Sequence, residues 1–443
     1  MAKAMTLVAK PRSAADLFAE AIAVTPGGVN TTIRQVGLPL VFDGARGAYV
    51  HDVDGKSYLD YHAAFGAIVL GHCHERVNRA VFRTLEEVDL IGVGTTPQEI
   101  DLAAKIVHHV PSAELVHICV TGTEATFHAI RVSRAVTGRR KIVKFQGCFH
   151  GGHDYLLMNV ISPREAIGRH DPGSAGMLPE TVAETLIADF NDLDGVERLF
   201  QQHPGEIAAV ILEPIPHNIG CVLPEPGFLE GLRRITIDHD AILIFDEVIT
   251  GFRHGLGGMQ ASSGVTPDLT TMGKAIANGY PIAAIAGRRD IMERFATAGG
   301  NVFFAGTYNA HPMSTVAALE TIAILEDGQV YERMFELGDR LRSGLCEIVD
   351  RLGIPAQVSG YGSVFVVYFV ELNRPVRSYT DLLDNDHDRY VRFHRGMVER
   401  GVFMLPLTLK RNHLSASHDA EDVARTLQAA EDTLREIATG KKG

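Results

Sequence analysis

The chain has 443 residues, 46% of them hydrophobic, and carries a formal net charge of −12. This length and hydrophobic content predict a globular protein with a large core and more than one domain. The acidic balance argues against nucleic acid as a partner, because binding a phosphate backbone needs clustered cations. With no secretory segment and no run near the roughly 20 apolar residues of a membrane helix, we expect a cytoplasmic protein without a membrane partner.

The region from about residue 15 to 65 predicts a mixed, peripheral layer. Residues 13–24, SAADLFAEAIAV, have the apolar spacing of a helix, and the PGG that follows breaks it. Residues 47–61, GAYVHDVDGKSYLDY, place an Asp-Gly turn between two short strand-like runs, which predicts a hairpin. The GHCH at residues 71–74 contains ligand-type side chains, but one short segment rarely closes a metal site, so we expect turn packing and no metal.

Apolar strand candidates alternate with helical stretches from about residue 70 to 325. The candidates are LVHICV (115–120), KIVKF (141–145), AAVILEP (208–214), AILIFDEV (241–248), DLTTMGK (268–274) and IAAIAG (282–287). This alternation predicts an α/β fold in which helices cover a parallel sheet.

The pattern changes again towards the C-terminus. A long amphipathic helix, a pair of strands and a closing helix are expected over residues 312–327, 357–370 and 419–438. We therefore predict a large domain over residues 70–327 and a smaller α+β domain built from residues 1–69 and 328–443.

Three features of the central region carry chemistry. Asp246 and Glu247 stand where the strand AILIF would end, and ligands of open parallel sheets collect beyond the carboxyl ends of the strands. Lys274 follows another strand-like run, and the TGT at residues 121–123 opens a helix whose free N–H groups suit a phosphate. Alone, these are equally a solvated strand end, a surface cation and a helix N-cap. Together they describe a pyridoxal 5′-phosphate site, with an amine for the aldehyde, a carboxylate for the pyridine nitrogen and a helix end for the phosphate.

The same features lie within motifs that resemble a known family. The motifs include TPGGVNTTIR, TGTEAT, GRRKIVKFQGCFHGGHD, LIFDEVITGFR, TPDLTTMGKAIANG and FAGTYNAHP. Over nearly its full length the chain is similar to the class III aminotransferases, which are fold-type I enzymes that depend on pyridoxal phosphate. Within that family it resembles the glutamate-1-semialdehyde 2,1-aminomutases most closely. The resemblance implies a large domain with a mostly parallel sheet and a small domain made from both chain ends.

The resemblance assigns cofactor contacts residue by residue. Lys274 matches the lysine that forms the Schiff base and moves protons, and Asp246 matches the aspartate that keeps the pyridine nitrogen protonated. Phe149 stands where a stacking tyrosine is usual, His150 follows it, and Val248 would cover the other ring face. The remaining cofactor positions are Gly122 and Thr123 at the phosphate, Glu213 and Asn218 in a nearby loop where they equally suit capping, and Thr307, which reaches the neighbouring subunit's phosphate in a homodimer.

The expected substrate pocket departs from the aminomutase pattern. Arg34 matches the arginine that binds the substrate carboxylate, a task that suits a guanidinium because it pairs bidentately. Phe65 stands where a tryptophan is usual, and Lys410 replaces a glutamate. A cation at residue 410 would favour a second anionic group or exclude a diamine intermediate.

We therefore expect an aminotransferase that moves an amino group between a carboxylate-bearing amino donor and a keto acid acceptor, both small molecules. Three alternatives stay open. They are intramolecular amino transfer as in the aminomutase, racemisation or epimerisation with Lys274 as the proton carrier, and a cofactor-binding protein without catalysis.

Overall fold

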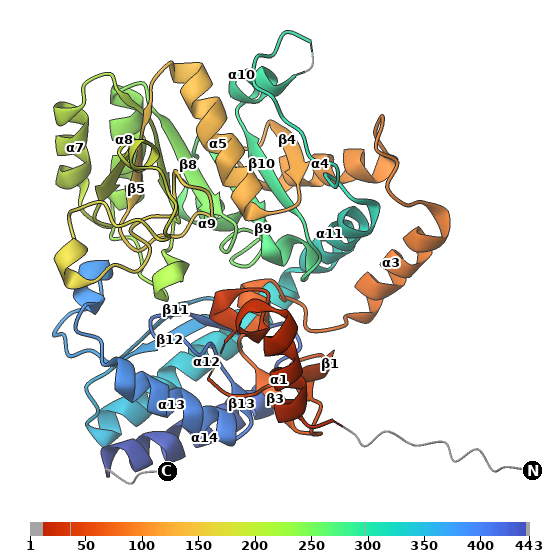
Figure 1. Ribbon diagram of the computed structural model, residues 1–443, viewed down its shortest axis with the longest axis vertical. Helices are drawn as coiled ribbons and strands as arrows, with labels where there is room; N and C mark the ends of the chain where they lie inside the picture. The colour runs from red at the N-terminus through yellow and green to blue at the C-terminus, as the bar shows by residue number, and fades with distance from the viewer. Residues whose placement is uncertain (1–11, 36, 297, 440–443) are drawn as a thin grey trace, which may run out of the picture.

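The computed structural model describes residues 12–35, 37–296 and 298–439 and consists of two lobes, one above the other in Figure 1. Residues 1–11, where we expect no secretory segment, lie outside the described residues, as do residues 440–443 of the predicted small domain. None of the helices within the described ranges combines the length and hydropathy that a membrane span requires.

The upper lobe is built around a seven-stranded sheet. Its strands in spatial order are β4 (Leu115–Cys119), β10 (Ala283–Gly287), β9 (Leu269–Gly273), β8 (Ile242–Glu247), β7 (Ile207–Leu212), β5 (Lys141–Phe145) and β6 (Thr185–Ala188). The α/β prediction is confirmed, with one correction to the parallel sheet. Strand β10 runs antiparallel to both of its neighbours, and its apolar run could not reveal direction because a strand buried on both faces has the same composition either way.

Helices cover both faces of this sheet, as Figure 1 shows for α5 in front of it. Ile211 and Ile244 pack in one cluster with residues of α5, whereas Val210 and Leu243 pack in another with residues of α7 and α8. Alternate residues of a strand face opposite sides, so these strands are apolar throughout. The helices of this lobe are α3 (Glu75–Glu87), α4 (Pro97–His109), α5 (Gly122–Thr137), α6 (Pro179–Val182), α7 (Leu193–Gln202), α8 (Phe228–Asp238), α9 (Gly258–Ser263), α10 (Arg289–Met292) and α11 (Pro312–Leu325).

The lower lobe joins the two ends of the chain, as the red and blue segments of Figure 1 show. One sheet has the order β1 (Phe42–Arg46), β2 (Tyr49–Asp52), β3 (Ser57–Asp60) and β13 (Val402–Phe403), and the other β11 (Gln357–Tyr361), β12 (Val364–Tyr368) and β14 (Asn412–His413). The lobe's helices are α1 (Ala14–Val24), α2 (Ala63–Gly66), α12 (Gly328–Leu352), α13 (His387–Glu399) and α14 (Ala420–Ala438). Strand β13 pairs with β3, and α14 packs on α12 and α13. The predicted hairpin is β2–β3, while the domain limits at residues 69/70 and 327/328 stay predictions.

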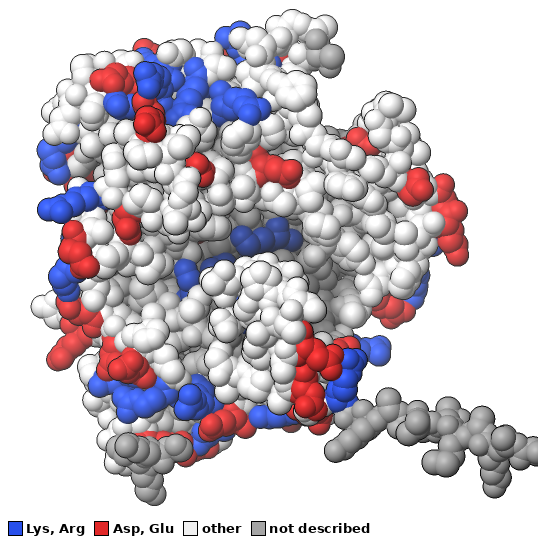
Figure 2. Space-filling view, in the orientation of Figure 1, with Lys and Arg blue, Asp and Glu red and all other residues white. Residues whose placement is uncertain are grey.

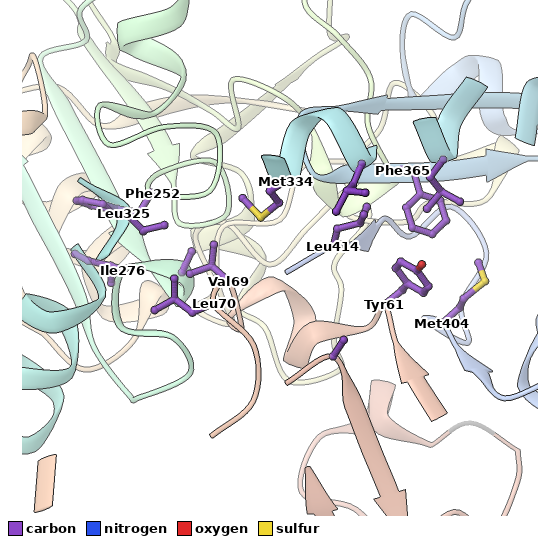
Figure 3. Close-up of a cluster of buried hydrophobic side chains, with 14 of the residues drawn as sticks. Tyr61, Val69, Leu70, Phe252, Ile276, Leu325, Met334, Phe365, Met404 and Leu414 are labelled. Atoms are coloured by element: carbon purple, nitrogen blue, oxygen red, sulfur yellow. The ribbon is translucent and has the colours of Figure 1, made fainter. Parts of the chain in front are cut away.

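A continuous apolar core joins the lobes. In Figure 3, Val69 and Leu70 lie between the upper-lobe side chains at the left, such as Ile276, and the lower-lobe side chains at the right, such as Tyr61. The fully buried Arg253 guanidinium adds a polar connection across the same region. Nη2 donates to the carbonyls of Gly66 and Ile68 at 3.0 and 2.7 Å. Nη1 reaches the C-terminal segments through the carbonyl of Leu414 at 3.1 Å and the hydroxyl of Ser363 at 3.2 Å.

Candidate active site

Three strands of the central sheet end at one edge and carry the motifs predicted to form the cofactor site. The register places both Cys119, at the end of β4, and Gly273, at the end of β9, opposite Ala283 of β10. It also pairs Asp246 of β8 with Thr271 of β9. The helix start, the acid pair and the lysine therefore leave the sheet side by side, at the edge where open α/β sheets bind ligands.

Lys274 comes directly after β9, with a backbone φ of 47° in the left-handed region. Burial and, to a smaller extent, the Arg411 guanidinium lower the pKa of its amine to about 8, and the carboxylates of Asp246 and Glu213 oppose the change. No hydrogen bond from a described residue contributes to this shift. The side chain therefore offers an amine that is partly unprotonated near neutral pH, as a nucleophilic lysine must be.

The Asp246 side chain is 5% exposed and is held from three directions. Oδ2 lies 2.7 Å from Nδ1 of His150, and Oδ1 accepts from the Thr271 hydroxyl and the Val248 N–H, both at 3.1 Å. Because an ionised carboxylate can only accept, His150 carries a proton on Nδ1. Asp246 is thus a fixed acceptor at the predicted ring position, and His150 supports the acid from behind.

The adjacent acid, Glu247, has a different environment. Its Oε2 accepts from the Thr250 hydroxyl at 2.8 Å and the Met259 N–H at 2.7 Å, and its Oε1 accepts from the backbone and side-chain N–H groups of Gln260 at 3.1 Å. Burial raises the pKa of Glu247, and these hydrogen bonds oppose that change. Glu247 therefore holds the start of α9, which leaves Asp246 as the acid of the site.

Helix α5 presents its N-terminus to the same edge. Thr121 is the N-cap, its hydroxyl accepts from the Glu124 N–H at 3.2 Å, and the Glu124 carboxylate folds back to the Thr121 N–H at 2.8 Å. The amides of Gly122 and Thr123 have no backbone acceptor among the described residues. The first turn therefore offers two N–H groups and the positive end of the helix dipole to an anion.

Close backbone contacts enclose this helix end. A Cβ on Gly122 would lie 3.1 Å from the Val248 side chain, and one on Gly151 would lie 2.7 Å from Thr123. The Gly152 N–H donates to the Thr123 hydroxyl at 3.2 Å. The loop after β5, the first turn of α5 and the turn after β8 therefore form one wall, in which a Cβ would be tight at Gly122 and has no room at Gly151.

Phe149 lies in the loop after β5, and 42% of its side chain is exposed. Its N–H donates to Oε1 of Glu213 at 2.9 Å, and Nδ2 of Asn218 donates to the Gly147 carbonyl at 2.7 Å. Glu213 and Asn218 therefore contact the backbone of this loop, which is the capping interpretation of their sequence positions.

Basic side chains lie in the hollow between the two lobes in Figure 2. Arg411 is 6% exposed, donates from Nη2 to the Phe65 carbonyl at 3.0 Å, and has a buried Nε without a partner in the described part of the chain. Arg34 is exposed in a short turn at residues 32–34. Both guanidinium groups lower the pKa of His62, after the larger effects of burial and of the opposing Asp60 carboxylate. Arg34, His62 and Arg411 therefore belong to one region.

Phe65 lies in a strained turn. Ala63, Ala64 and Phe65 have φ values of 48°, 49° and 60°, and Gly66 follows with 87°. Left-handed residues with a Cβ cost about 1–2 kcal/mol each, and such strain collects at ligand sites. Gly66 is also required by packing, since a Cβ there would lie 2.6 Å from Nε2 of His413. The turn aims the Phe65 carbonyl at Arg411.

The last two predicted residues lie apart from these contacts. Lys410 is 9% exposed, and its amine donates to the backbone carbonyl and Oδ1 of Asn218. Burial and the Arg411 guanidinium lower the pKa of this amine to about 7, against the Glu213 carboxylate. Thr307 is exposed and lines a groove of about 610 Å³ whose walls contain neither Lys274 nor Asp246. Within one chain, the structure does not bring Thr307 to the helix end that would hold the phosphate.

Sequence reasoning missed three residues of the site. Arg411 is one position from Lys410, and only the packed structure distinguishes which of the two cations has unused donors. Thr271 orients Asp246 from the next strand, and its place two residues before the end of β9 was the available signal. His62 had no signal, because its proximity to Arg34 and Arg411 depends on the turn at residues 63–66.

The GHCH segment has ordinary contacts. Nε2 of His72 lies 2.7 Å from Oδ2 of Asp60. Within residues 12–35, 37–296 and 298–439, no group of three or more His, Cys, Asp and Glu side chains is arranged to hold a metal ion.

The sheet edge fits pyridoxal phosphate. Lys274 offers an amine, Asp246 offers a buried acceptor, and Gly122 and Thr123 offer N–H groups that would suit a phosphate. Val248 packs beside Gly122, and the Phe149 side chain is 42% exposed.

Comparisons with known proteins agree with this geometry. Residues 32–417 match the family model of the class-III aminotransferases. A glutamate-1-semialdehyde 2,1-aminomutase of Methanothrix thermoacetophila is 43% identical over 418 residues, which is 94% of this chain and 95% of that protein.

Two solved structures extend the comparison to the fold. An omega-transaminase from Sphaerobacter thermophilus has 36% identity and a TM-score of 0.90, and the match covers 97% of this chain and 99% of that one. A glutamate-1-semialdehyde aminomutase from Pseudomonas aeruginosa PAO1 in complex with PMP has 26% identity and a TM-score of 0.87, and the match covers 96% of this chain and 94% of that one. The chain therefore belongs to the class-III aminotransferases, fold-type I enzymes whose cofactor is pyridoxal phosphate.

Proposed function

We propose that this protein moves an amino group between a carboxylate-bearing amino compound and a keto acid. The observation that supports this reading is Arg411, a buried guanidinium that lowers the pKa of Lys274 and has one hydrogen-bond acceptor in the described chain. A guanidinium with unused N–H donors can bind a carboxylate through two parallel hydrogen bonds. Arg34, exposed in the same region, offers a second cation, so a carboxylate entering between the lobes would meet both.

The contacts at the sheet edge support the proposed cofactor-binding roles. Gly122 and Thr123 would bind the phosphate, and Asp246 would hold the proton on the pyridine nitrogen because a fixed carboxylate stabilises the cation. Phe149 and Val248 would cover the two ring faces.

Lys274 would carry the protons of the reaction. Bound pyridoxal phosphate supplies an aldehyde that takes up the amino group and a ring that delocalises the negative charge left on the substrate carbon. The Lys274 amine, partly unprotonated near neutral pH, would take the proton from that carbon and deliver it to the cofactor. Arg34 and Arg411 would orient the carbon by holding the carboxylate, and the two lobes would keep water away.

We also propose a homodimer in which Thr307 completes the neighbouring site. The exposed apolar side chains on or near α3, α4 and the segment that contains Thr307 include Phe82, Val93, Phe303 and Tyr308. Large apolar surface of this kind is typical of a protein interface. A mixed dimer tests the idea, because a Lys274→Ala subunit would supply Thr307 to an intact Lys274 in a Thr307→Asp subunit. Co-expressed variants should regain turnover that neither has alone, and no recovery in isolated mixed dimers contradicts the proposal.

Intramolecular transfer is the second candidate, because the 43% identical relative bears an aminomutase name. That reaction needs the site to retain a diamine until transfer is complete. The Arg411 guanidinium puts positive charge close enough to Lys274 to lower its pKa, and a cation there opposes the binding of a diamine. Conversion of glutamate-1-semialdehyde without any keto acid would decide for this candidate.

A donor panel tests the main proposal. The holoenzyme is mixed with α-, β- and ω-amino acids and with matched amines that lack the carboxylate, and the bound aldehyde's absorption is followed. We expect carboxylate-bearing donors to remove this absorption and keto acids to restore it. Deuterium exchange at the substrate carbon without any keto acid formed would indicate racemisation, and a panel that leaves the absorption unchanged would indicate a binding protein.

Variants of the two arginines test which side chains bind the substrate carboxylate. Arg34→Ala and Arg411→Ala should each lower kcat/KM for carboxylate-bearing donors about 10- to 100-fold, the usual value of a hydrogen-bonded charge pair. Amines without the carboxylate should lose far less. Equal losses on both substrate classes would reject the assigned roles.

A further inference from the structure

The Lys410 amine has an unusual set of partners for a buried lysine. It is 9% exposed and donates to the Asn218 carbonyl at 2.7 Å and to Asn218 Oδ1 at 2.6 Å. Both acceptors are neutral, and no ion pair to Lys410 is present in the described part of the chain. A buried lysine without a carboxylate partner costs free energy, so the contact with Asn218 calls for a function.

Asn218 also contacts the loop after β5. Its Nδ2 donates to the Gly147 carbonyl at 2.7 Å, and its own N–H is 3.3 Å from Oε2 of Glu213. The amide orientation is defined by the Gly147 carbonyl, which can only accept and therefore faces the NH₂ group of Asn218. Asn218 therefore links the C-terminal lobe to the loop of the upper lobe through one side chain.

The loop has little freedom at this contact. Gly147 has a φ of 91°, and a Cβ there would lie 3.0 Å from Ile219. Two residues later, the Phe149 N–H donates to Oε1 of Glu213 at 2.9 Å. The backbone that presents the Phe149 ring is thus held on both sides by groups that Asn218 contacts.

We propose that Lys410 is a positioning residue that holds Phe149 against the cofactor through Asn218 and Gly147. This inference rests on the proposed stacking role of Phe149, and it gives Lys410 a task other than substrate recognition. It also connects cofactor affinity to the position of the C-terminal lobe, which supplies Lys410.

Cofactor binding to the full-length apoprotein tests the proposal without any amino donor. The Kd for pyridoxal phosphate is measured for the wild type, Lys410→Met, Asn218→Ala, Phe149→Ala and the Lys410→Met/Phe149→Ala double variant. Circular dichroism of the bound cofactor reports ring orientation. Lys105→Met is the matched control, since Lys105 pairs with Glu326 on the surface.

We expect Lys410→Met and Asn218→Ala to raise the Kd about tenfold and to weaken the cofactor dichroism, as loss of a buried charged hydrogen bond does. The double variant should bind no more weakly than Phe149→Ala alone, because Lys410 acts through that ring. Lys105→Met should match the wild type. Should Lys410→Met fail to fold, Asn218→Ala and its double variant with Phe149→Ala carry the same test.

Two results would overturn the inference. If the increases in Kd caused by Lys410→Met and by Phe149→Ala multiply in the double variant, Lys410 does not act through Phe149. An unchanged Kd and dichroism, with a raised KM for carboxylate-bearing donors, would return Lys410 to the substrate pocket. If Phe149→Ala itself leaves the Kd unchanged, the stacking role fails, and the donor panel still tests the proposed function separately.

Discussion

Nδ1 of His150 donates to Oδ2 of Asp246 across 2.7 Å, and both side chains are at least 95% buried. With Thr271 and the Val248 N–H on the other oxygen, the carboxylate has three hydrogen bonds and one fixed orientation. An acid so oriented can keep a bound pyridine nitrogen protonated without reorganising, which is the condition for strong electrostatic stabilisation.

Asp246→Asn should keep the fold and bind the cofactor, yet lower kcat by about 10²- to 10³-fold, the usual cost of one preorganised electrostatic group. The amide has similar size but no charge, so it cannot stabilise the protonated ring. Single-turnover loss of the aldehyde absorption measures the effect. Asp238→Asn, at an exposed position of α8, is the control, and an Asp246→Asn enzyme with a wild-type rate would exclude the assigned role.

Cofactor capture by the apoprotein should depend on pH through the Lys274 amine. Its pKa is lowered to about 8, and only the unprotonated amine is nucleophilic. Capture should therefore slow about tenfold per pH unit below 8 and level off above it. Borohydride quenching followed by quantification of the Lys274 peptide gives the rate at each pH. A midpoint near 10.5 would show an ordinary exposed lysine, and Lys274→Ala defines the background.

The large sheet was predictable because both of its faces are buried, so strands such as β7 and β8 are apolar along their whole length. Strand β6 was missed, since Thr185–Ala188 is too short to show a pattern. The cofactor motifs were readable because each is local in sequence, as Asp246 after AILIF illustrates. The partners of Lys410 and Arg411 were not, because each contacts residues about 190 to 350 positions away. No local pattern determines which of two adjacent cations turns towards the cleft.

Arg253→Met should lower the free energy of unfolding by about 3–5 kcal/mol, because it leaves several buried acceptors without a donor. All four acceptors belong to the lower lobe, whereas Arg253 belongs to the upper lobe, so the loss should weaken the contact between them. Urea unfolding of the holoenzyme measures it, with Arg234→Met at an exposed position of α8 as the control. Arg253→Lys should lose less stability than Arg253→Met and more than the Arg234→Met control, since one ammonium cannot reach four acceptors. A loss below 1 kcal/mol would mean that apolar packing alone joins the lobes.

Ala64→Gly should separate stability from substrate binding. Ala64 is exposed and left-handed, with φ 49° and ψ 53°, so glycine removes a steric cost of about 1–2 kcal/mol and adds an entropic cost of about 0.5–1 kcal/mol. The melting temperature should stay level or rise by a few degrees.

The same change should loosen the turn that holds the Phe65 carbonyl against Arg411, and KM for carboxylate-bearing donors should rise severalfold while the cofactor Kd stays constant. Asp240→Gly is the control. It removes the Cβ of another left-handed residue, with a φ of 51°, in the loop between α8 and β8, and it should leave KM unchanged. An Ala64→Gly protein with a wild-type KM would show that the turn does not position Arg411. A clear loss of stability would show instead that the left-handed backbone is not strained, because the glycine entropy would then be the only effect.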